Sequence, residues 1–264
     1  MNLDWLERTI LLIGNEEIKK LNAANVLVVG MGGVGSYAAE MICRAGVGKM
    51  TIVDGDVVDR TNRNRQLPAT FDTEGKSKVE WMAQRLLDIN PEVELTVINE
   101  FLKPERIAEI LETKYDYVLD CIDSVTPKIT LIELAYRKRY KIISSMGAGG
   151  KIDPTQVKVT DLNDTYQCKL ASNIRKRLKT KKIYRGIKAV FSTEEVITES
   201  LKMTDGSNFK KSFYGTISYL PCVFGCVAAS VAIRDIIGAE IEMTKRPEGL
   251  VKRTLASKKG KKLE

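Results

Sequence analysis

Apolar and polar positions along the chain form two alternating kinds of segment. Short runs rich in Val, Ile and Leu, bounded by Gly, Asp or Asn, predict strands buried in a parallel sheet. Longer amphipathic stretches between them predict helices. The predicted strands are residues 26–29, 50–53, 94–98, 117–119 and 141–145, and the predicted helices are residues 15–23, 34–45, 76–90, 104–112 and 128–138. This βαβ rhythm favours an α/β, Rossmann-like fold with a mostly parallel sheet flanked by helices.

The rhythm changes after Gly150 and predicts a C-terminal α+β extension packed on the same core. Strands are expected at residues 154–160 and 188–192, a basic helix at 171–179 and a polar loop at 204–211. Residues 213–233 contain no charged side chain and are long enough to span a membrane. Because Pro221 and several Gly and Ser residues lower the apolarity of this segment, we expect a buried helix in a protein without membrane association.

The composition of the 264-residue chain excludes some kinds of metal site and catalytic base and indicates its cellular compartment. Its five cysteines are odd in number and widely spaced, and no apolar signal precedes Asp4, so we expect a cytoplasmic protein without a disulfide framework. The chain has no histidine, which excludes histidine metal ligands and histidine general bases.

The formal net charge of +8 is concentrated in two segments. Residues 169–188 carry many Lys and Arg residues and no acid, and residues 252–262 form a Lys-rich tail. Such segments increase the affinity for polyanions through counterion release. A solvated helix face and a disordered tail are the alternative interpretations.

A glycine-rich segment, residues 30–35 (GMGGVG), lies between the first predicted strand and the following helix. A tight turn that brings backbone amides close to a phosphate needs residues without Cβ, and the helix N-terminus adds partial positive charge. Gly30, Gly32, Gly33 and Gly35 therefore predict a nucleotide-phosphate site. Asp54, at the end of the second strand, is placed to accept hydrogen bonds from both ribose hydroxyls. These features suit NAD and ATP equally.

Two cations and a further acid favour ATP. Arg65 lies in the polar loop after Asp54, and Lys78 lies at a helix start. Displacement at a nucleotide phosphate needs such cations, because charge builds on the phosphate oxygens and on the departing pyrophosphate. Asp123 follows the fourth predicted strand, and its carboxylate suits Mg²⁺ bound against the phosphates.

In these segments the sequence resembles the ThiF/MoeB/ubiquitin-activating-enzyme superfamily of adenylyltransferases. The matching residues occur in the expected order, as Gly30-x-Gly32-Gly33-x-Gly35, Asp54-x-Asp56-x-Val58, Asn62-Arg63-Asn64-Arg65-Gln66, Lys78 and Asp120-x-x-Asp123. The resemblance implies that Asp54 holds the ATP ribose, that Arg65 and Lys78 bind the triphosphate, and that Asp123 serves Mg²⁺ and the α-phosphate. It implies further nucleotide contacts from Asp56, Asn62 and Gln66, and a homodimer in which Arg8 reaches the partner's site.

Within this superfamily, the chain is similar to the tRNA threonylcarbamoyladenosine dehydratase subfamily. The likeness extends to about residue 239 and includes residues 88–92 (DINPE), 147–155 (GAGGKIDPT) and 190–192 (VFS). It implies activation by ATP of the threonylcarbamoyl carboxylate on adenosine 37 of tRNA, followed by cyclisation. The basic helix region then binds tRNA, through Arg175, Arg177, Lys179, Lys181, Lys182 and Arg185. Sulfur-trafficking proteins are implied as further partners.

This resemblance divides the chain into an ATP-binding adenylation region at residues 1–150, a basic tRNA-binding extension of the same domain at 151–240, and a basic, flexible tail at 241–264.

The chain departs from the subfamily at residues 168–171 (CKLA), where relatives tend to have Asp-Pro-Leu-Ala. Some relatives carry a cysteine near the position of Lys210 or Lys211, so a thiol relay is not expected here. An adenylyltransferase for a ubiquitin-like sulfur carrier and a non-catalytic nucleotide-sensing protein are the alternative functions.

Overall fold

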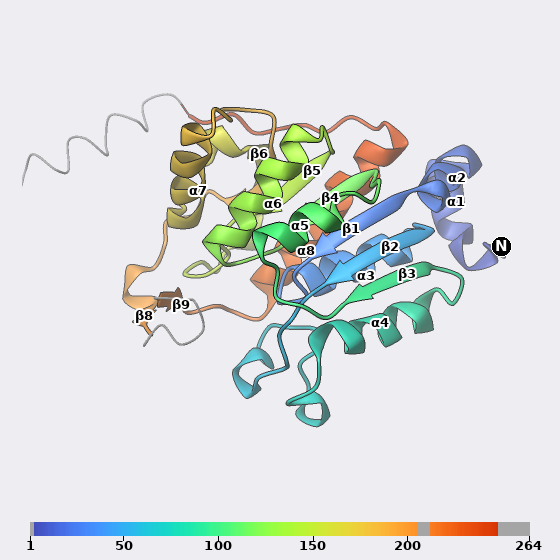
Figure 1. Ribbon diagram of the computed structural model, residues 1–264, viewed down its shortest axis with the longest axis horizontal. Coiled ribbons are helices and arrows are strands. Elements are labelled where there is room, and N and C mark those ends of the chain that lie inside the picture. Colours follow the sequence, from blue (N-terminus) through green and yellow to red (C-terminus); the bar gives the residue numbers. More distant parts are fainter. Residues whose placement is uncertain (1–2, 205–211, 248–264) are drawn as a thin grey trace, which may run out of the picture.

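A seven-stranded sheet forms the centre of the computed structural model, which describes residues 3–204 and 212–247 (Figure 1). Its strand order is β3-β2-β1-β4-β5-β7-β6. Six strands run parallel, and β6 pairs antiparallel with β7 at one edge. The strands are β1 (Asn25–Val29), β2 (Lys49–Val53), β3 (Glu94–Ile98), β4 (Tyr117–Asp120), β5 (Ile142–Ser145), β6 (Val157–Asp161) and β7 (Lys188–Ser192). The predicted mostly parallel, Rossmann-like sheet is confirmed.

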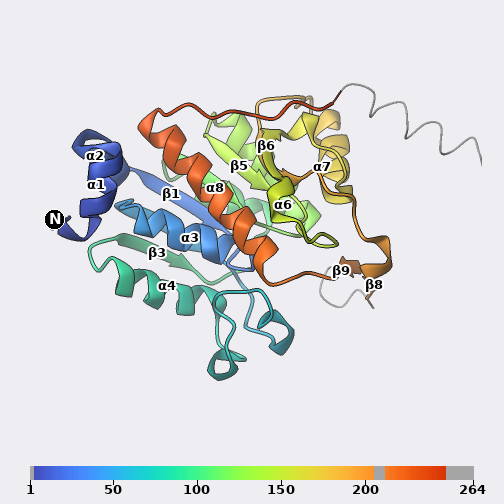
Figure 2. The same cartoon turned by 180° about the vertical axis from the view of Figure 1, so that it is seen from behind.

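Helices cover both faces of this sheet (Figures 1 and 2). One face carries α3 (Gly35–Arg44), α4 (Lys78–Ile89) and α8 (Tyr219–Ile237), and the other carries α5 (Pro104–Ile110), α6 (Val125–Arg137) and α7 (Lys169–Thr180). Each layer buries its own apolar cluster against alternate side chains of the strands, with Val26 and Val28 on one side of β1 and Leu27 and Val29 on the other. Two short helices, α1 (Glu7–Ile13) and α2 (Asn15–Ala23), lie beside the end of the sheet where β1 begins.

Helix α8 fits tightly against the start of α3. A Cβ on Gly225 would lie 2.3 Å from the Val34 carbonyl oxygen, and a Cβ on Gly33 would lie 3.0 Å from Pro221 Cβ. Larger residues at either glycine would separate the two segments. By length and composition, α8 is also apolar enough to cross a membrane, but it buries Leu220, Phe224 and further apolar residues in the core. Its packing supports the predicted core helix.

The structure corrects some predicted boundaries. Residues 213–233 were expected as one helix, but Ser212–Tyr214 forms strand β9, which pairs antiparallel with β8 (Leu201–Met203), and α8 begins only at Tyr219. A run without charges marks burial but does not mark the residue where a helix starts. The strand expected from residue 154 begins at Val157, because a 3-10 turn at Pro154–Gln156 precedes it. Most of the loop expected at residues 204–211, including Lys210 and Lys211, lies outside the described residues.

The topology brings several loops to one edge of the sheet. After β3 the chain returns to place β4 beside β1, so the order of strands reverses between β1 and β4. Ligands of open α/β sheets bind beyond the carboxyl ends of the strands at such a switch point. The glycine turn follows β1 there, and the segment containing Asp123 follows β4.

Candidate functional site

The glycine turn after β1 has a backbone path that only glycine permits at two positions. Gly30 has φ of 95°, and a Cβ on Gly35 would lie 1.7 Å from the Gly30 carbonyl oxygen. Helix α3 begins at Gly35 without a side-chain cap. The Ser36 and Ala38 amides donate to the Gly32 and Val34 carbonyl oxygens, so the groups placed to bind phosphate are the amides of the glycine turn before them and the positive end of the helix dipole.

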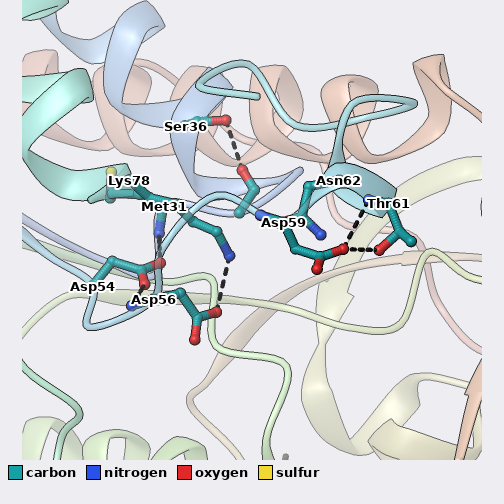
Figure 3. Close-up of polar contacts among 9 residues, drawn as sticks. Met31, Ser36, Asp54, Asp56, Asp59, Thr61, Asn62 and Lys78 are labelled. Atoms are coloured by element: carbon teal, nitrogen blue, oxygen red, sulfur yellow. Dashed lines mark hydrogen bonds and ion pairs between the residues drawn. The ribbon is translucent and has the colours of Figure 1, made fainter. Parts of the chain in front are cut away.

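Asp54 connects the glycine turn to the loop after β2. Its Oδ2 accepts a hydrogen bond from the Met31 amide at 2.5 Å, and its Oδ1 accepts one from the Asp56 amide at 2.7 Å (Figure 3). Burial raises the pKa of the Asp54 carboxyl, although these two amides and nearby Lys78 favour the ionised form. Each carboxylate oxygen has a second lone pair. Asp54 thus has acceptor capacity left for ribose hydroxyls beside the phosphate-binding turn.

Lys78 is the first residue of α4 and points toward the same loop. Its Nζ lies 2.9 Å from Asp56 Oδ2, and its side chain is only 5% exposed whereas that of Asp56 is 52% exposed. The Lys78 amide also donates to the Asp56 carbonyl oxygen. Asp56 is therefore placed as the counter-ion that holds the Lys78 ammonium in position near Asp54.

The loop that carries Arg65 is fixed by a reciprocal cap. The Asp59 side chain accepts from the Thr61 amide, and Asn62 Oδ1 accepts from the Asp59 amide at 3.1 Å (Figure 3). Asn62 is 8% exposed, so the structure gives this residue a role in shaping the loop. Gln66 packs against the glycine turn. A Cβ on Gly32 would lie 3.8 Å from Gln66 Nε2. Its buried Oε1 has no hydrogen-bond partner among the described residues.

Arg65 lies between the glycine turn and the segment after β4. Its Nη1 donates to the Thr61 carbonyl oxygen at 3.0 Å and to Asn64 Oδ1 at 2.8 Å. Burial lowers the pKa of the guanidinium, whereas the carboxylates of Asp123 and Asp59 act to raise it. The structure thus brings Arg65, which lies beside Gly33, within electrostatic reach of Asp123.

A buried polar network that the sequence did not predict supports Asp123. Lys128 Nζ lies 2.8 Å from Asp120 Oδ2, and both side chains are completely buried. The Ser144 hydroxyl donates to the same carboxylate oxygen at 2.6 Å, and Lys128 also donates to the Ile122 carbonyl oxygen. The network holds the backbone immediately before Asp123. The paired register of Asp120 on β4 with Ser144 on β5 could not be inferred before the strand order was known.

The predicted Mg²⁺ ligand fits a site completed by a nucleotide. In the described part of the chain, no three acidic, cysteine or histidine side chains cluster as a metal site would require. Mg²⁺ is often held by one or two carboxylates together with substrate phosphates and water. Asp123 beside the glycine turn suits that arrangement, in which the ion would neutralise phosphate charge.

Arg8 lies far from the other predicted site residues of its own chain. It is an exposed residue of α1, near the end of the sheet where β1 begins, whereas the glycine turn follows the opposite end of β1 (Figure 1). Arg8 can therefore reach a nucleotide site only if that site belongs to another protomer.

The six predicted tRNA-binding residues fall into two groups. Three have partners within the chain: Arg175 donates to the Thr165 hydroxyl, Lys181 pairs with Glu133, and Arg185 pairs with Asp164. Arg177, Lys179 and Lys182 are exposed, and the described residues give their side chains no ion pair. The basic tail from Lys252 onward lies outside the described residues.

Comparison with known proteins identifies the family of this chain. The model of the ThiF family matches residues 6–259. The chain belongs to the ThiF family. It is 38% identical over 257 residues to tRNA threonylcarbamoyladenosine dehydratase of Escherichia coli (strain K12), covering 88% of this chain and 94% of that protein. The corresponding protein of Bacillus subtilis (strain 168) is 35% identical, with coverage of 89% and 95%.

A solved structure shows the same likeness in three dimensions. The crystal structure of the Escherichia coli dehydratase in complex with ATP superposes with a TM-score of 0.81 at 38% identity, covering 89% of this chain and 95% of that chain. The predicted membership of the ThiF family and similarity to its dehydratase subfamily are therefore confirmed. The individual site residues stay predictions, supported by the arrangement described above.

Proposed function

We propose that this ThiF family chain is an ATP-dependent tRNA threonylcarbamoyladenosine dehydratase. The observation that carries the proposal is the convergence of the glycine turn, Arg65 and Asp123 at the switch point between β1 and β4. This arrangement suits a nucleotide that is attacked at a phosphate. The near full-length likeness to dehydratases supports tRNA as the source of the attacking carboxylate.

The proposed reaction has two steps. The carboxylate of the threonylcarbamoyl group attacks the α-phosphate of ATP, the bond to pyrophosphate breaks, and an acyl adenylate forms. A carbamoyl nitrogen or oxygen of the same group then attacks the activated carbonyl carbon, AMP leaves, and a proton is released. The net change in the nucleoside is the loss of one water.

Each site residue has a role in the first step. Asp54 accepts the ribose hydroxyls, while amides of the glycine turn hold the phosphates. Arg65 and Lys78 stabilise the charge that builds on the α-phosphate and pyrophosphate oxygens. Asp123 would hold Mg²⁺, which would supply further neutralisation of phosphate charge.

We also propose an oligomeric state, a cellular compartment and further partners for this protein. We place Arg8 of one protomer at the nucleotide site of the other, in a cytoplasmic homodimer without membrane association. Residues 1–150 form the ATP-binding region, residues 151–240 the tRNA-binding extension and residues 241–264 the basic tail. Sulfur-trafficking proteins are included as further partners.

A mass measurement tests the proposal directly. Incubation of the purified protein with ATP, Mg²⁺ and threonylcarbamoylated tRNA is expected to lower the mass of the modified nucleoside by one water, with one AMP formed for each product. An unchanged nucleoside mass would overturn the proposal. Pyrophosphate exchange that requires the C-terminus of a sulfur-carrier protein and ignores tRNA would support the adenylyltransferase alternative.

The exposed residues Arg177 and Lys179 of α7, together with Lys182 in the turn that follows it, give a second prediction. Combined Arg177→Glu, Lys179→Glu and Lys182→Glu replacement is expected to weaken tRNA binding at least about 10-fold, because phosphate contacts are replaced by repulsion. The slope of log affinity against log salt should become shallower by about 3. Filter binding at several salt concentrations measures both quantities. Lys19→Glu, Lys20→Glu and Lys49→Glu together provide a control of equal charge change, since these exposed lysines lie near the other end of the sheet.

A further inference from the structure

The turn after β5 buries the ammonium group of Lys151. Lys151 is only 2% exposed, and its Nζ donates to the Ser192 carbonyl oxygen at 2.7 Å. The described residues place no carboxylate in salt-bridge contact with this Nζ. Burial lowers the pKa of Lys151, although Cys168 and Glu194 act in the opposite direction. A buried charge is costly unless it is paired, so an anion at this point would complete the electrostatics.

A second unsatisfied group lies at the same turn. The Tyr214 hydroxyl is buried and has no hydrogen-bond partner among the described residues. Tyr214 packs directly on the turn, because a Cβ on Gly149 would lie 3.0 Å from Tyr214 Cβ and one on Gly150 would lie 3.1 Å from Tyr214 Cδ1. Buried polar groups are normally hydrogen-bonded, so the unsatisfied hydroxyl of a residue that packs on the turn of Lys151 indicates a missing ligand.

The surroundings of Lys151 carry more positive than negative charge, because Glu194, the carboxylate that acts on Lys151, already accepts hydrogen bonds from the Ile152 and Asp153 amides. Helix α7, with 12 residues, starts beside the turn: Cys168 caps it, and the Cys168 Sγ would lie 3.6 Å from a Cβ on Gly147. The positive end of the helix dipole is therefore close to the turn. The Lys169 ammonium lies 5.5 Å from the centroid of the Tyr214 ring. The ligand that this environment favours is an anion.

The turn adjoins the candidate nucleotide site. Asn64, the neighbour of Arg65, donates to the Thr216 carbonyl oxygen at 2.9 Å. Thr216 in turn packs on Gly149, since a Cβ there would lie 3.3 Å from Thr216 Oγ1. Segment 214–216 thus connects the loop that carries Arg65 to the turn that carries Lys151. A ligand at the turn would lie on the same edge of the sheet as the nucleotide.

We propose that Lys151 and Tyr214 bind the threonylcarbamoyl group of the substrate, with the Lys151 ammonium paired to its carboxylate and the Tyr214 hydroxyl donating to its carbamoyl oxygen. Tyr214 belongs to β9, and the Gly150 amide beside Lys151 donates to the Gly215 carbonyl oxygen, so the two groups lie on adjoining segments. The inference rests on the proposed function and adds the part of the site that recognises the acyl group. It differs from the basic surface of α7, which contacts the RNA backbone.

The test uses Lys151→Met and Tyr214→Phe in the full-length protein, after the wild type has been shown to dehydrate threonylcarbamoylated tRNA. We expect Lys151→Met to lower the dehydration rate about 100-fold, since one partner of a buried charge pair is lost. Tyr214→Phe should lower it about 10-fold, since one hydrogen bond is lost. Calorimetry should show ATP affinity within about two-fold of wild type for both variants. Because an uncompensated charge is removed, the Tm of Lys151→Met should not fall.

A matched control and two contrary results complete the design. Lys158→Met changes an exposed lysine on β6, whose Nζ donates to the Thr155 carbonyl oxygen, and should leave every measurement unchanged. Wild-type dehydration rates in Lys151→Met would overturn the inference while leaving the proposed function intact. A joint fall in Tm and ATP affinity would also overturn it, because Lys151 would then be a structural residue. Absence of dehydration by the wild type would instead refute the proposed function.

Discussion

Lys128→Met is expected to lower the free energy of unfolding by about 3–5 kcal/mol, the usual cost of removing one partner of a buried ion pair. The replacement leaves the Asp120 carboxylate in the core with only the Ser144 hydroxyl and the Ile122 amide as donors. It also removes the hydrogen bond to the Ile122 carbonyl oxygen, which fixes the backbone before Asp123. Urea unfolding followed by circular dichroism gives the change in stability.

Two further variants identify the cause of this loss. Arg137→Met on the same helix removes a side chain that is 55% exposed and pairs with Glu133, and it should change stability by less than about 1 kcal/mol. Adding Asp120→Asn to Lys128→Met removes the stranded charge and should recover part of the lost stability. If Lys128→Met alone costs under about 1 kcal/mol, the buried pair does not organise this region.

Arg65→Gln is expected to slow the dehydration of threonylcarbamoylated tRNA by about 10²–10³-fold, the usual effect of removing one preorganised group that stabilises transition-state charge. The Arg65 guanidinium is held by two hydrogen bonds from its own loop and lies near Asp123, so little reorganisation is needed when charge develops on phosphate. Single-turnover measurement of AMP formation separates this effect from tRNA release.

The control for Arg65→Gln comes from the same loop. Arg60 is exposed, and Arg60→Gln removes an equal charge at a position without a proposed contact to the nucleotide. This variant should retain the wild-type rate within about two-fold. Equal losses in the two variants would show that the loop acts through its net charge, and the role given to Arg65 would be wrong.

The strands of the sheet could be predicted from the sequence because each is a short run of apolar residues whose pattern does not depend on distant segments. Parallel strands appear as short apolar runs, and both the partly exposed edge strand Glu94–Ile98 and the more buried Lys188–Ser192 have the predicted limits. The glycine turn was equally clear, since Gly30 and Gly35 serve one local backbone path. By contrast, the hairpin of β8 and β9 has no such signal, because strands of three residues are too short to show a period.

Part of the candidate site could not be predicted from the sequence, because its residues come from segments that are distant in the chain and meet only in the fold. Asp120, Lys128 and Ser144 come together only when β5 lies beside β4, so residue spacing gave no indication of their network. The basic residues of segment 169–188 also could not be judged from the sequence alone. The sequence counts Lys181 and Arg185 as available cations, whereas the fold pairs them with Glu133 and Asp164, which are distant in the chain.

The contact between α8 and the glycine turn has a consequence for biosynthesis. The turn is among the first parts of the chain to leave the ribosome, but Pro221 and Gly225, which pack against Gly33 and Val34, are made much later. The nascent chain therefore lacks the support of its phosphate-binding turn until translation is nearly complete. We therefore expect nucleotide binding only from the finished polypeptide, and a chain that ends before α8 should not consume ATP.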